Sequence, residues 1–182
     1  MAVDQQDELL EVLDERGAVV GVRRRAEVHS DPSLVHRAVH VIVRNRRGEV
    51  FLQRRSRQKR IQPGRWDSSV GGHVDPGESY EDAAERELAE ELGASLSRLG
   101  GRSALVRLHD YVWRTSVETE RVRTFQLLYE GPFELHPEEI EEGRFWSVSN
   151  LRAAAGGGEL TPNLEHELRL LGLIPTAERA RT

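Results

Sequence analysis

The chain has 182 residues, of which 37% are hydrophobic and 31% are charged, a length that suits one well-packed domain over residues 1–182. Asp and Glu total 31 against 26 Lys and Arg, and the formal net charge of −5 disfavours a nucleic-acid polymer as partner. Cysteine is absent, which excludes disulfides, thiolate metal sites and cysteine nucleophiles.

Targeting signals are also missing from the printed sequence. No apolar run reaches the ~18 residues of a transmembrane helix, and the segment 1–17 lacks the cationic start and apolar core of a signal peptide. We therefore expect a cytoplasmic protein without a membrane partner. The sequence does not predict the oligomeric state.

The first half of the chain predicts β structure. Segments 9–22 and 36–56 each consist of two apolar stretches around a polar turn, which is typical of hairpins. An Arg-rich loop follows at 54–66, then a short strand at 68–70. Gly71 and Gly72 come directly after that strand.

The next segment predicts a helix. Ser79 can cap its first turn together with Asp82, and Ala84, Leu88 and Leu92 form an apolar stripe. Gly93 is expected to end this helix.

The remainder predicts further strands and a final helix. Strands are expected at about 102–113, 121–129 and 144–148, and a C-terminal helix at about 161–174. The run 136–146 is expected to be a solvated loop that leads into a strand anchored by Trp146. This order predicts a mixed central sheet flanked by helices.

Three carboxylates lie close together on the predicted helix. At about 100° per residue, Glu87, Glu90 and Glu91 fall within one arc that the apolar stripe does not occupy. Carboxylate oxygens suit a hard cation such as Mg²⁺ or Mn²⁺, which substrate phosphates usually complete. A solvated acidic helix face is the alternative interpretation.

The spacing around these residues resembles a known motif. Gly72 is followed by five residues and Glu78, then by seven residues and the run RELAEELG, which begins at Arg86. This pattern is similar to the Nudix box of the Nudix hydrolase superfamily, here residues 72–94. Only Ala94 departs, since the family prefers a larger aliphatic residue there. The resemblance implies an α/β/α sandwich with a mixed central sheet.

The resemblance also implies roles for individual residues. Glu87, Glu90 and Glu91 would be metal ligands together with the Gly72 carbonyl, and Glu78 and Arg86 would brace them. The reaction would be metal-assisted attack of water on a diphosphate, with a nearby glutamate as base. The candidate bases are Glu90 and Glu91 in the box and, later in the chain, Glu118 and Glu120.

Residues from about 8 to 150 resemble the type 1 isopentenyl-diphosphate isomerases and the hydrolases closest to them. The similar segments include HSDPSLVHRAVHVIV, which begins at His29, and VETERVRTFQLLYEG, which begins at Val117. In the isomerases three histidines and two glutamates hold a second metal, here Zn²⁺ or Mn²⁺. The matching residues are His29, His36, His73, Glu118 and Glu120.

These residues also have simpler interpretations. The three histidines could be ordinary hydrogen-bonding groups, as we expect for His40, His109, His136 and His166, and the two glutamates could be exposed at a strand edge. Arg25, Arg55 and Lys59 match cations that grip the diphosphate in the isomerases, although an Arg-rich loop can also be merely solvated. Four aromatic residues could stack on a base or pack in the core: Trp66, Tyr111, Trp113 and Phe125.

One position separates the two activities. The isomerases use a cysteine for proton transfer where this chain has Gly71, and they tend to lose the box glutamates that this chain keeps. We therefore expect a metal-dependent hydrolase acting on a small-molecule diphosphate, such as a nucleoside di- or triphosphate. The alternatives are an isopentenyl-diphosphate isomerase and a catalytically silent diphosphate-binding module.

Overall fold

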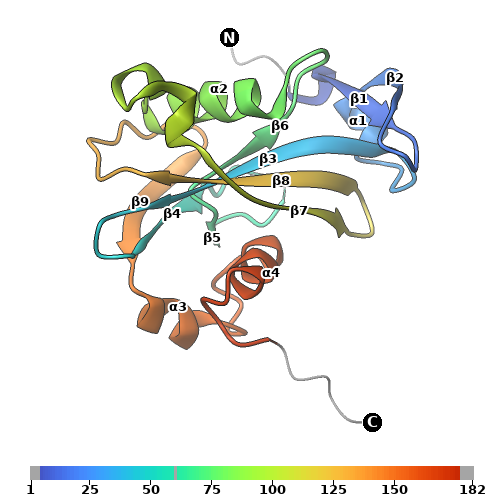
Figure 1. Ribbon diagram of the computed structural model, residues 1–182. Helices are drawn as coiled ribbons and strands as arrows, with labels where there is room; N and C mark the ends of the chain where they lie inside the picture. Colours follow the sequence, from blue (N-terminus) through green and yellow to red (C-terminus); the bar gives the residue numbers. More distant parts are fainter. Residues whose placement is uncertain (1–4, 60, 177–182) are drawn as a thin grey trace.

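The computed structural model describes residues 5–59 and 61–176 (Figure 1). Strands alternate with short helices along the chain. The strands are β1 (Leu9–Leu13), β2 (Val19–Arg24), β3 (Val35–Arg44), β4 (Val50–Arg55), β5 (Trp66–Asp67), β6 (Val70–His73), β7 (Val106–Arg114), β8 (Thr119–Leu128) and β9 (Ile140–Trp146). The α-helices are α1 (Arg25–Val28), α2 (Tyr80–Leu92), α3 (Val148–Ala154) and α4 (Pro162–Leu170), and 3₁₀ turns are η1 (Gln5–Asp7), η2 (Leu96–Arg98) and η3 (Gly101–Ala104).

Within the described residues, nine strands form one mixed sheet around β3. Strand β3 pairs antiparallel with β6 and parallel with β8 over its whole length, while β1 and β4 contact its two ends. The two predicted hairpins, β1–β2 and β3–β4, are both present. Residues on β3 therefore lie between residues of β6 and residues of β8.

Helices cover both faces of this sheet (Figure 1). Helix α2 packs on one face over a cluster that includes Leu88, Leu92 and Phe125, whereas α3 and α4 cover the other face over Trp66 and Leu164. Both faces of β3 are therefore buried, which explains the three consecutive β-branched apolar residues Val41, Ile42 and Val43. This arrangement confirms the predicted mixed sheet flanked by helices.

Helix α2 begins and ends as its sequence predicts. The Ser79 hydroxyl accepts a hydrogen bond from the backbone N–H of Asp82, and Gly93 closes the helix with a φ of 65°. That left-handed conformation strongly favours glycine. The predicted stripe of Ala84, Leu88 and Leu92 is fully buried. The opposite arc of the helix therefore remains available for the charged residues.

Several element boundaries differ from the predictions. Instead of one strand at 68–70, two short strands lie on either side of Ser68 and Ser69. Strand β9 begins at Ile140, inside the run expected to be a loop, because Ile140–Trp146 pairs with β4. Turn η3 occupies the start of the strand expected at 102–113.

The C-terminal region differs in the same way. Helix α4 ends at Leu170, before the expected end at 174, and α3 was not predicted. Strand pairing and packing between distant segments decide these boundaries, and neither leaves a local signal. No helix in the described ranges has the length and apolar character needed to cross a membrane.

The core contact of α2 gives a stability prediction. Leu88→Ala should lower the free energy of unfolding by about 2–5 kcal/mol, because Leu88 is fully buried and its loss leaves a cavity. Urea denaturation followed by circular dichroism measures this change. Leu170→Ala is the matched control, since Leu170 is half exposed, and it should cost less than about 1 kcal/mol. Equal losses in the two variants would contradict the packing described.

Candidate active site

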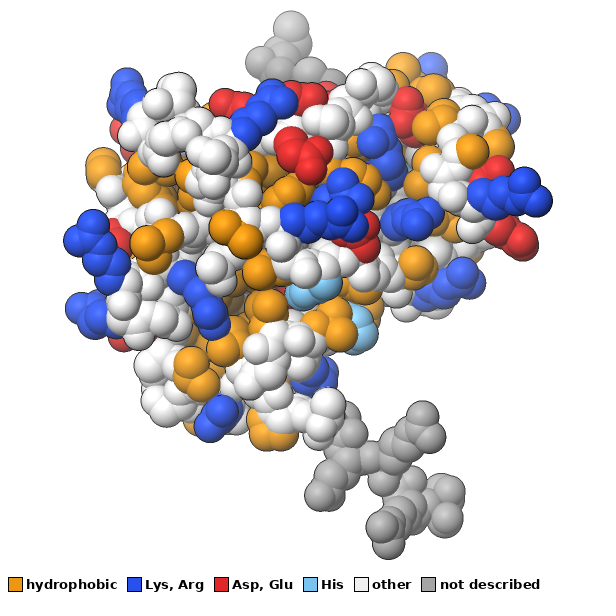
Figure 2. All heavy atoms as spheres, in the orientation of Figure 1, with side chains coloured by type: hydrophobic (Ala, Val, Ile, Leu, Met, Phe, Trp, Pro, Cys, Tyr) orange, Lys and Arg blue, Asp and Glu red, His pale blue; other side chains and the backbone are white. Residues whose placement is uncertain are grey.

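A cavity of about 600 Å³ opens between the C-terminal half of α2, strand β6 and the region before α4. Its wall includes residues from both predicted groups, among them His73, Glu87, Glu90 and Glu120. On the face shown in Figure 2, acidic and basic side chains are interspersed, so no extended field of one sign covers that face. The cavity wall likewise carries charged side chains of both signs.

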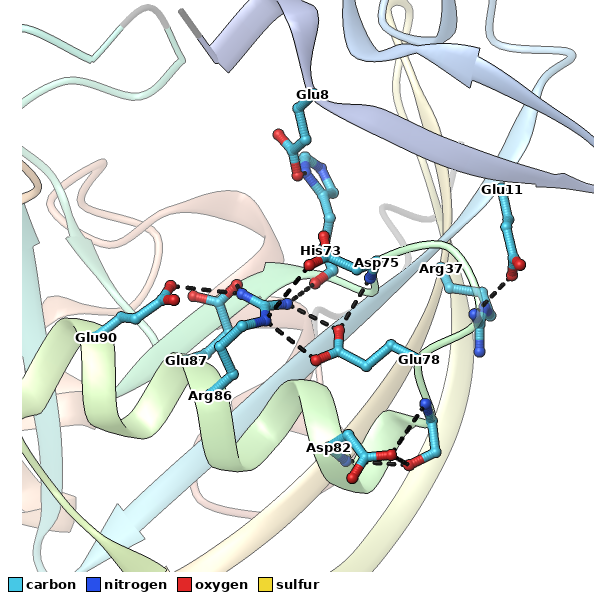
Figure 3. A network of polar contacts seen from close by, with 11 residues as sticks. Glu8, Glu11, Arg37, His73, Asp75, Glu78, Asp82, Arg86, Glu87 and Glu90 are labelled. Carbon is cyan, nitrogen blue, oxygen red and sulfur yellow. Dashed lines mark hydrogen bonds and ion pairs between the residues drawn. The ribbon is translucent and has the colours of Figure 1, made fainter. Parts of the chain in front are cut away.

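Arg86 joins the loop before α2 to the helix itself (Figure 3). Its guanidinium donates hydrogen bonds to Glu78 at 2.9 and 3.1 Å, to Glu87 at 2.6 Å and to Glu90 at 3.4 Å. It also donates to the backbone carbonyl of His73 at 2.9 Å. These ion pairs outweigh burial and raise the pKa of Arg86. Glu78 and Arg86, which were expected to support the box carboxylates, therefore contact each other, and Arg86 also contacts Glu87.

Gly72 lies directly against the carboxylate of Glu87. Gly72 pairs with Val39 in the sheet, and a Cβ atom at this position would overlap the Glu87 carboxylate. Glycine is therefore required for the helix carboxylate to approach the backbone of β6. Burial raises the pKa of Glu87, although Arg86 opposes the change.

Glu91 is the buried member of the box carboxylates, whereas Glu90 is largely exposed. The Glu91 carboxylate accepts hydrogen bonds from the Gln53 side chain at 3.1 Å and from the Gly71 backbone N–H at 3.4 Å. Burial and the nearby Glu87 raise the pKa of Glu91 to about 8. Glu91 is thus held at the base of the cavity by two neutral donors.

The three predicted histidines converge. The rings of His29, His36 and His73 lie 5.1–5.2 Å apart, centroid to centroid. His29 follows the short helix α1, His36 is on β3 and His73 ends β6. The sheet register brings two of them together, because Ala38, two residues from His36 on the same face of β3, pairs with His73.

Glu118 and Glu120 complete this group. Glu118 lies 3.3 Å from Nδ1 of His29, and Glu120 lies 3.8 Å from Nε2 of His36 and 3.9 Å from Nε2 of His73. Strand β8 places Glu120 directly beside His36 in the parallel register. Burial and the neighbouring Glu120 raise the pKa of Glu118 to about 7. All five predicted residues therefore belong to one connected group of contacts.

The donor atoms of this group fit a metal ion. One atom from each of His29, His36 and His73 lies within 4.8 Å of the others, and so do single atoms from His36, Glu118 and Glu120. In the described part of the chain, the Nε2 atoms of His29 and His36 are buried without a hydrogen-bond partner. Burial lowers the pKa of both rings to about 3, so they are neutral and able to coordinate.

The three predicted substrate cations line the same cavity, and each is paired with a carboxylate. Arg25 contacts Glu8 at 2.8 Å, and Arg55 contacts Asp67 at 2.9 Å. Lys59 forms an ion pair with Glu139. The cavity wall thus carries fixed positive charge beside its acidic groups, as the sequence predicted, but that charge is already partnered.

Two contributors were not predicted. Glu8 contacts Nδ1 of His73 at 3.0 Å, and this contact and Arg25 outweigh burial and lower the pKa of Glu8 to about 2. Gln53 holds Glu91. No local motif marks either residue, because their partners are 65 and 38 positions away in the sequence. Of the four aromatic candidates, Trp66 and Phe125 are buried in the core, whereas Trp113 lines the cavity.

A further polar pair lies at the end of the cavity nearest α4. His40 on β3 contacts Glu167 on α4 at 3.2 Å, and Glu167 is fully buried. Burial alone would lower the pKa of His40, but Glu167 outweighs it and raises the pKa to about 9. Other ionisable groups facing this pair are Tyr111 and His109 on β7, Asp67 on β5 and Glu120 on β8.

This pair predicts a pH-dependent stability. The raised pKa of His40 means that its contribution is fully present below pH 6.5 and is lost as the pH rises through about 9. The stability difference between wild type and Glu167→Gln should therefore shrink by about 1–3 kcal/mol over this range, measured by urea denaturation.

Glu165→Gln on the same helix is the control. Its difference from wild type should stay constant, because its partner Arg169 keeps its charge throughout the range. A pH-independent difference for Glu167→Gln would contradict an ionic His40–Glu167 pair.

Known proteins are similar to this chain in sequence and in fold. The model of the NUDIX domain family matches residues 34–164. An uncharacterized Nudix hydrolase from Nostoc sp. is 45% identical over 93 residues, which cover 51% of this chain and 55% of that protein. An isopentenyl-diphosphate Delta-isomerase from Streptomyces coelicolor is 34% identical over 143 residues, which cover 79% of this chain and 73% of the isomerase.

A crystal structure from Deinococcus radiodurans is similar with a TM-score of 0.73 and 29% identity, covering 89% of this chain and 98% of that one. The chain spans about half the length of the Nostoc protein and of an uncharacterized Nudix hydrolase from Streptomyces coelicolor. The family model nevertheless covers most of the chain, including the whole of the box and its glutamates. The chain therefore belongs to the Nudix family.

Proposed function

We propose that this protein is a metal-dependent hydrolase that cleaves the diphosphate linkage of a nucleoside di- or triphosphate or a related organic diphosphate. The observation that carries this proposal is the meeting of two ligand groups at adjacent residues. Gly72 lies against the box carboxylate Glu87, and the next residue, His73, belongs to the histidine group. Both groups line one cavity of suitable size for a small molecule.

The box residues fit Mg²⁺ or Mn²⁺. Glu87, Glu90 and Glu91 supply carboxylate oxygens, and Gly72 supplies a backbone carbonyl. The histidine group of His29, His36, His73, Glu118 and Glu120 mixes nitrogen and oxygen donors, which suits Zn²⁺ or Mn²⁺. Bound metal would withdraw charge from phosphorus and make the attacking water more acidic.

The chain's own residues would position the reactants and accept the proton. A water oxygen forms a new bond to phosphorus as the bond from phosphorus to the bridging oxygen breaks. The leaving phosphate keeps that bridging oxygen, and a carboxylate takes the proton of the water. Glu90, Glu91 and Glu120 are the candidate bases, and Glu91 is supported by its fixed position under Gln53 and Gly71.

Arg25, Arg55 and Lys59 would bind the phosphate oxygens. Each would exchange or share its present carboxylate partner when an anionic substrate enters. Because arginine keeps its charge and offers several donors, Arg25 and Arg55 can bind substrate without releasing Glu8 or Asp67 completely.

Isomerase activity is disfavoured despite the similarity to isomerases. Proton transfer to a carbon skeleton needs an acid and a base on opposite sides, and the chain has Gly71 and no cysteine at the position where the isomerases have a thiol. A silent binding module is disfavoured by the retention of every box glutamate.

Turnover of a compound panel tests the proposed reaction. With Mg²⁺ or Mn²⁺, wild type should release phosphate or a nucleoside monophosphate from at least one nucleoside or organic diphosphate, identified by mass. Glu90→Gln and Glu91→Gln should lower kcat at least about 100-fold, since a metal ligand or base is lost, with little change in Tm without metal. Isomerisation of isopentenyl diphosphate above a metal-only control would overturn the proposal.

Glu85→Gln is the matched control for these variants. Glu85 lies on the same helix but pairs with Arg102 away from the cavity, so its turnover should stay within about twofold of wild type. Full activity of the Glu90→Gln, Glu91→Gln double variant would support the alternative interpretation, in which these residues form only a solvated helix face.

Metal stoichiometry tests the histidine group separately. Calorimetric titration with Mn²⁺ should show two sites per chain, and His29→Gln should remove one of them, because a neutral imidazole ligand is lost. The control His166→Gln should keep both, because His166 lies against Tyr111 and Trp113 instead. A single site in wild type, unaffected by His29→Gln, would remove the second metal but leave the hydrolase proposal standing.

A further inference from the structure

The histidine–carboxylate pair at the far end of the cavity has no role in the reaction described so far. Glu167 is fully buried, lies 3.2 Å from Nδ1 of His40 and also accepts a hydrogen bond from Thr124. A buried ion pair is weak support for stability, because desolvation offsets much of the attraction between the charges. The position of His40 on the cavity wall indicates a use in binding.

His40 presents its second ring nitrogen to the cavity. Within the described residues, the side-chain hydrogen bonds of His40 all use Nδ1, which faces Glu167 and Tyr111. The other edge of the ring, Cδ2 and Nε2, faces Gly71, where a Cβ atom would lie only 3.1 and 3.3 Å away. Gly71 therefore leaves room for the imidazole, whose Nε2 has no hydrogen-bond partner among residues 5–59 and 61–176.

The charge state of His40 sets what Nε2 can do. The buried carboxylate keeps the pKa of His40 near 9, so at neutral pH both ring nitrogens carry a proton. Nδ1–H points to Glu167, and Nε2–H is left as a charged hydrogen-bond donor. A ligand in the cavity can satisfy it only with an acceptor such as a hydroxyl, carbonyl or ring nitrogen.

His40 lies beside the proposed diphosphate site and away from the histidine group. Every second residue of β3 points to the same face, and these residues include His36, Ala38 and His40. His40 is about 13 Å along the strand from His36. The cavity wall also includes Asp67, Thr161 and Asn163, which are not metal-ligand candidates. Because His40 pairs with Gly71, the residue before Gly72, the organic group of a diphosphate held beside Gly72 can reach the His40 ring.

We propose that His40 is a specificity-determining residue that donates a hydrogen bond from Nε2 to an acceptor on the organic group of the substrate. Glu167 is the positioning residue that orients the ring. The substrate is then a diphosphate with a polar organic group, such as a nucleoside or sugar, and prenyl diphosphates are rejected. A hydrocarbon chain covering this donor would remove it from water without offering an acceptor, which costs far more than a missing apolar contact. This inference rests on the proposed function.

Selectivity measurements test the inference. With Mn²⁺, wild type should hydrolyse its best substrate among ADP, CDP, GDP, UDP and UDP-glucose with a kcat/KM at least about 100-fold above that for dimethylallyl diphosphate. His40→Leu should reduce this ratio about 10- to 100-fold, mainly through KM, because a ground-state hydrogen bond is lost. His40→Gln, which keeps a donor, should restore most of the ratio.

Two further variants test the positioning role of Glu167 and provide a control. Glu167→Gln preserves the shape of the pair, and it should move the KM for the polar substrate and its pH profile, while the kcat at saturation changes little. His166→Leu on the same helix is the control and should leave the ratio within about threefold of wild type. A ratio unchanged in His40→Leu, or a wild type that prefers dimethylallyl diphosphate, would overturn the inference while leaving hydrolysis established.

Binding separates failure of this inference from failure of the proposed function. The α,β-methylene analogue of ADP should raise the Tm of wild type more than methylenediphosphonate does, and His40→Leu should abolish this extra shift without affecting the shift from methylenediphosphonate. Absence of turnover on every compound would refute the hydrolase, whereas His40→Leu retaining the extra shift would refute the role of His40.

Discussion

The guanidinium of Arg86 is the contact on which the candidate site depends. It binds Glu78 before the helix, Glu87 and Glu90 on the helix, and the carbonyl of His73 at the end of β6. Without this cation, the carboxylates facing the cavity would repel one another and separate. One positive charge therefore fixes loop, helix and sheet edge in one geometry before any ligand binds.

The sheet supplies the second half of the site. Parallel pairing of β3 with β8 sets Glu120 beside His36, and antiparallel pairing with β6 brings His73 to the same place. Register in a sheet buried on both faces is strongly specified, because a shift by one residue would move every side chain to the opposite face. The geometry of the histidine group is thus a consequence of core packing, which keeps the neutral imidazoles of His29 and His36 buried.

The cavity wall contains two different electrostatic environments. Around Glu91 and Glu118, burial and neighbouring carboxylates favour the protonated acids, so positive charge is needed for full ionisation. At His40, a single buried carboxylate favours the protonated imidazole instead. A ligand that is anionic at one end and rich in acceptors at the other matches both, which links the proposed chemistry to the proposed selectivity.

The sequence by itself determined the box helix, because its signals are local: Ser79 caps it, Gly93 ends it and the glutamate spacing follows from helical periodicity. The histidine group was predicted from the resemblance to the isomerases and not from a local signal. Only the tertiary structure decided the boundaries of β9 and α4, the support of His73 by Glu8, and the contact of His40 with Glu167. Those contacts join residues 65 and 127 positions apart, and chain folding alone brings such distant groups within hydrogen-bond reach.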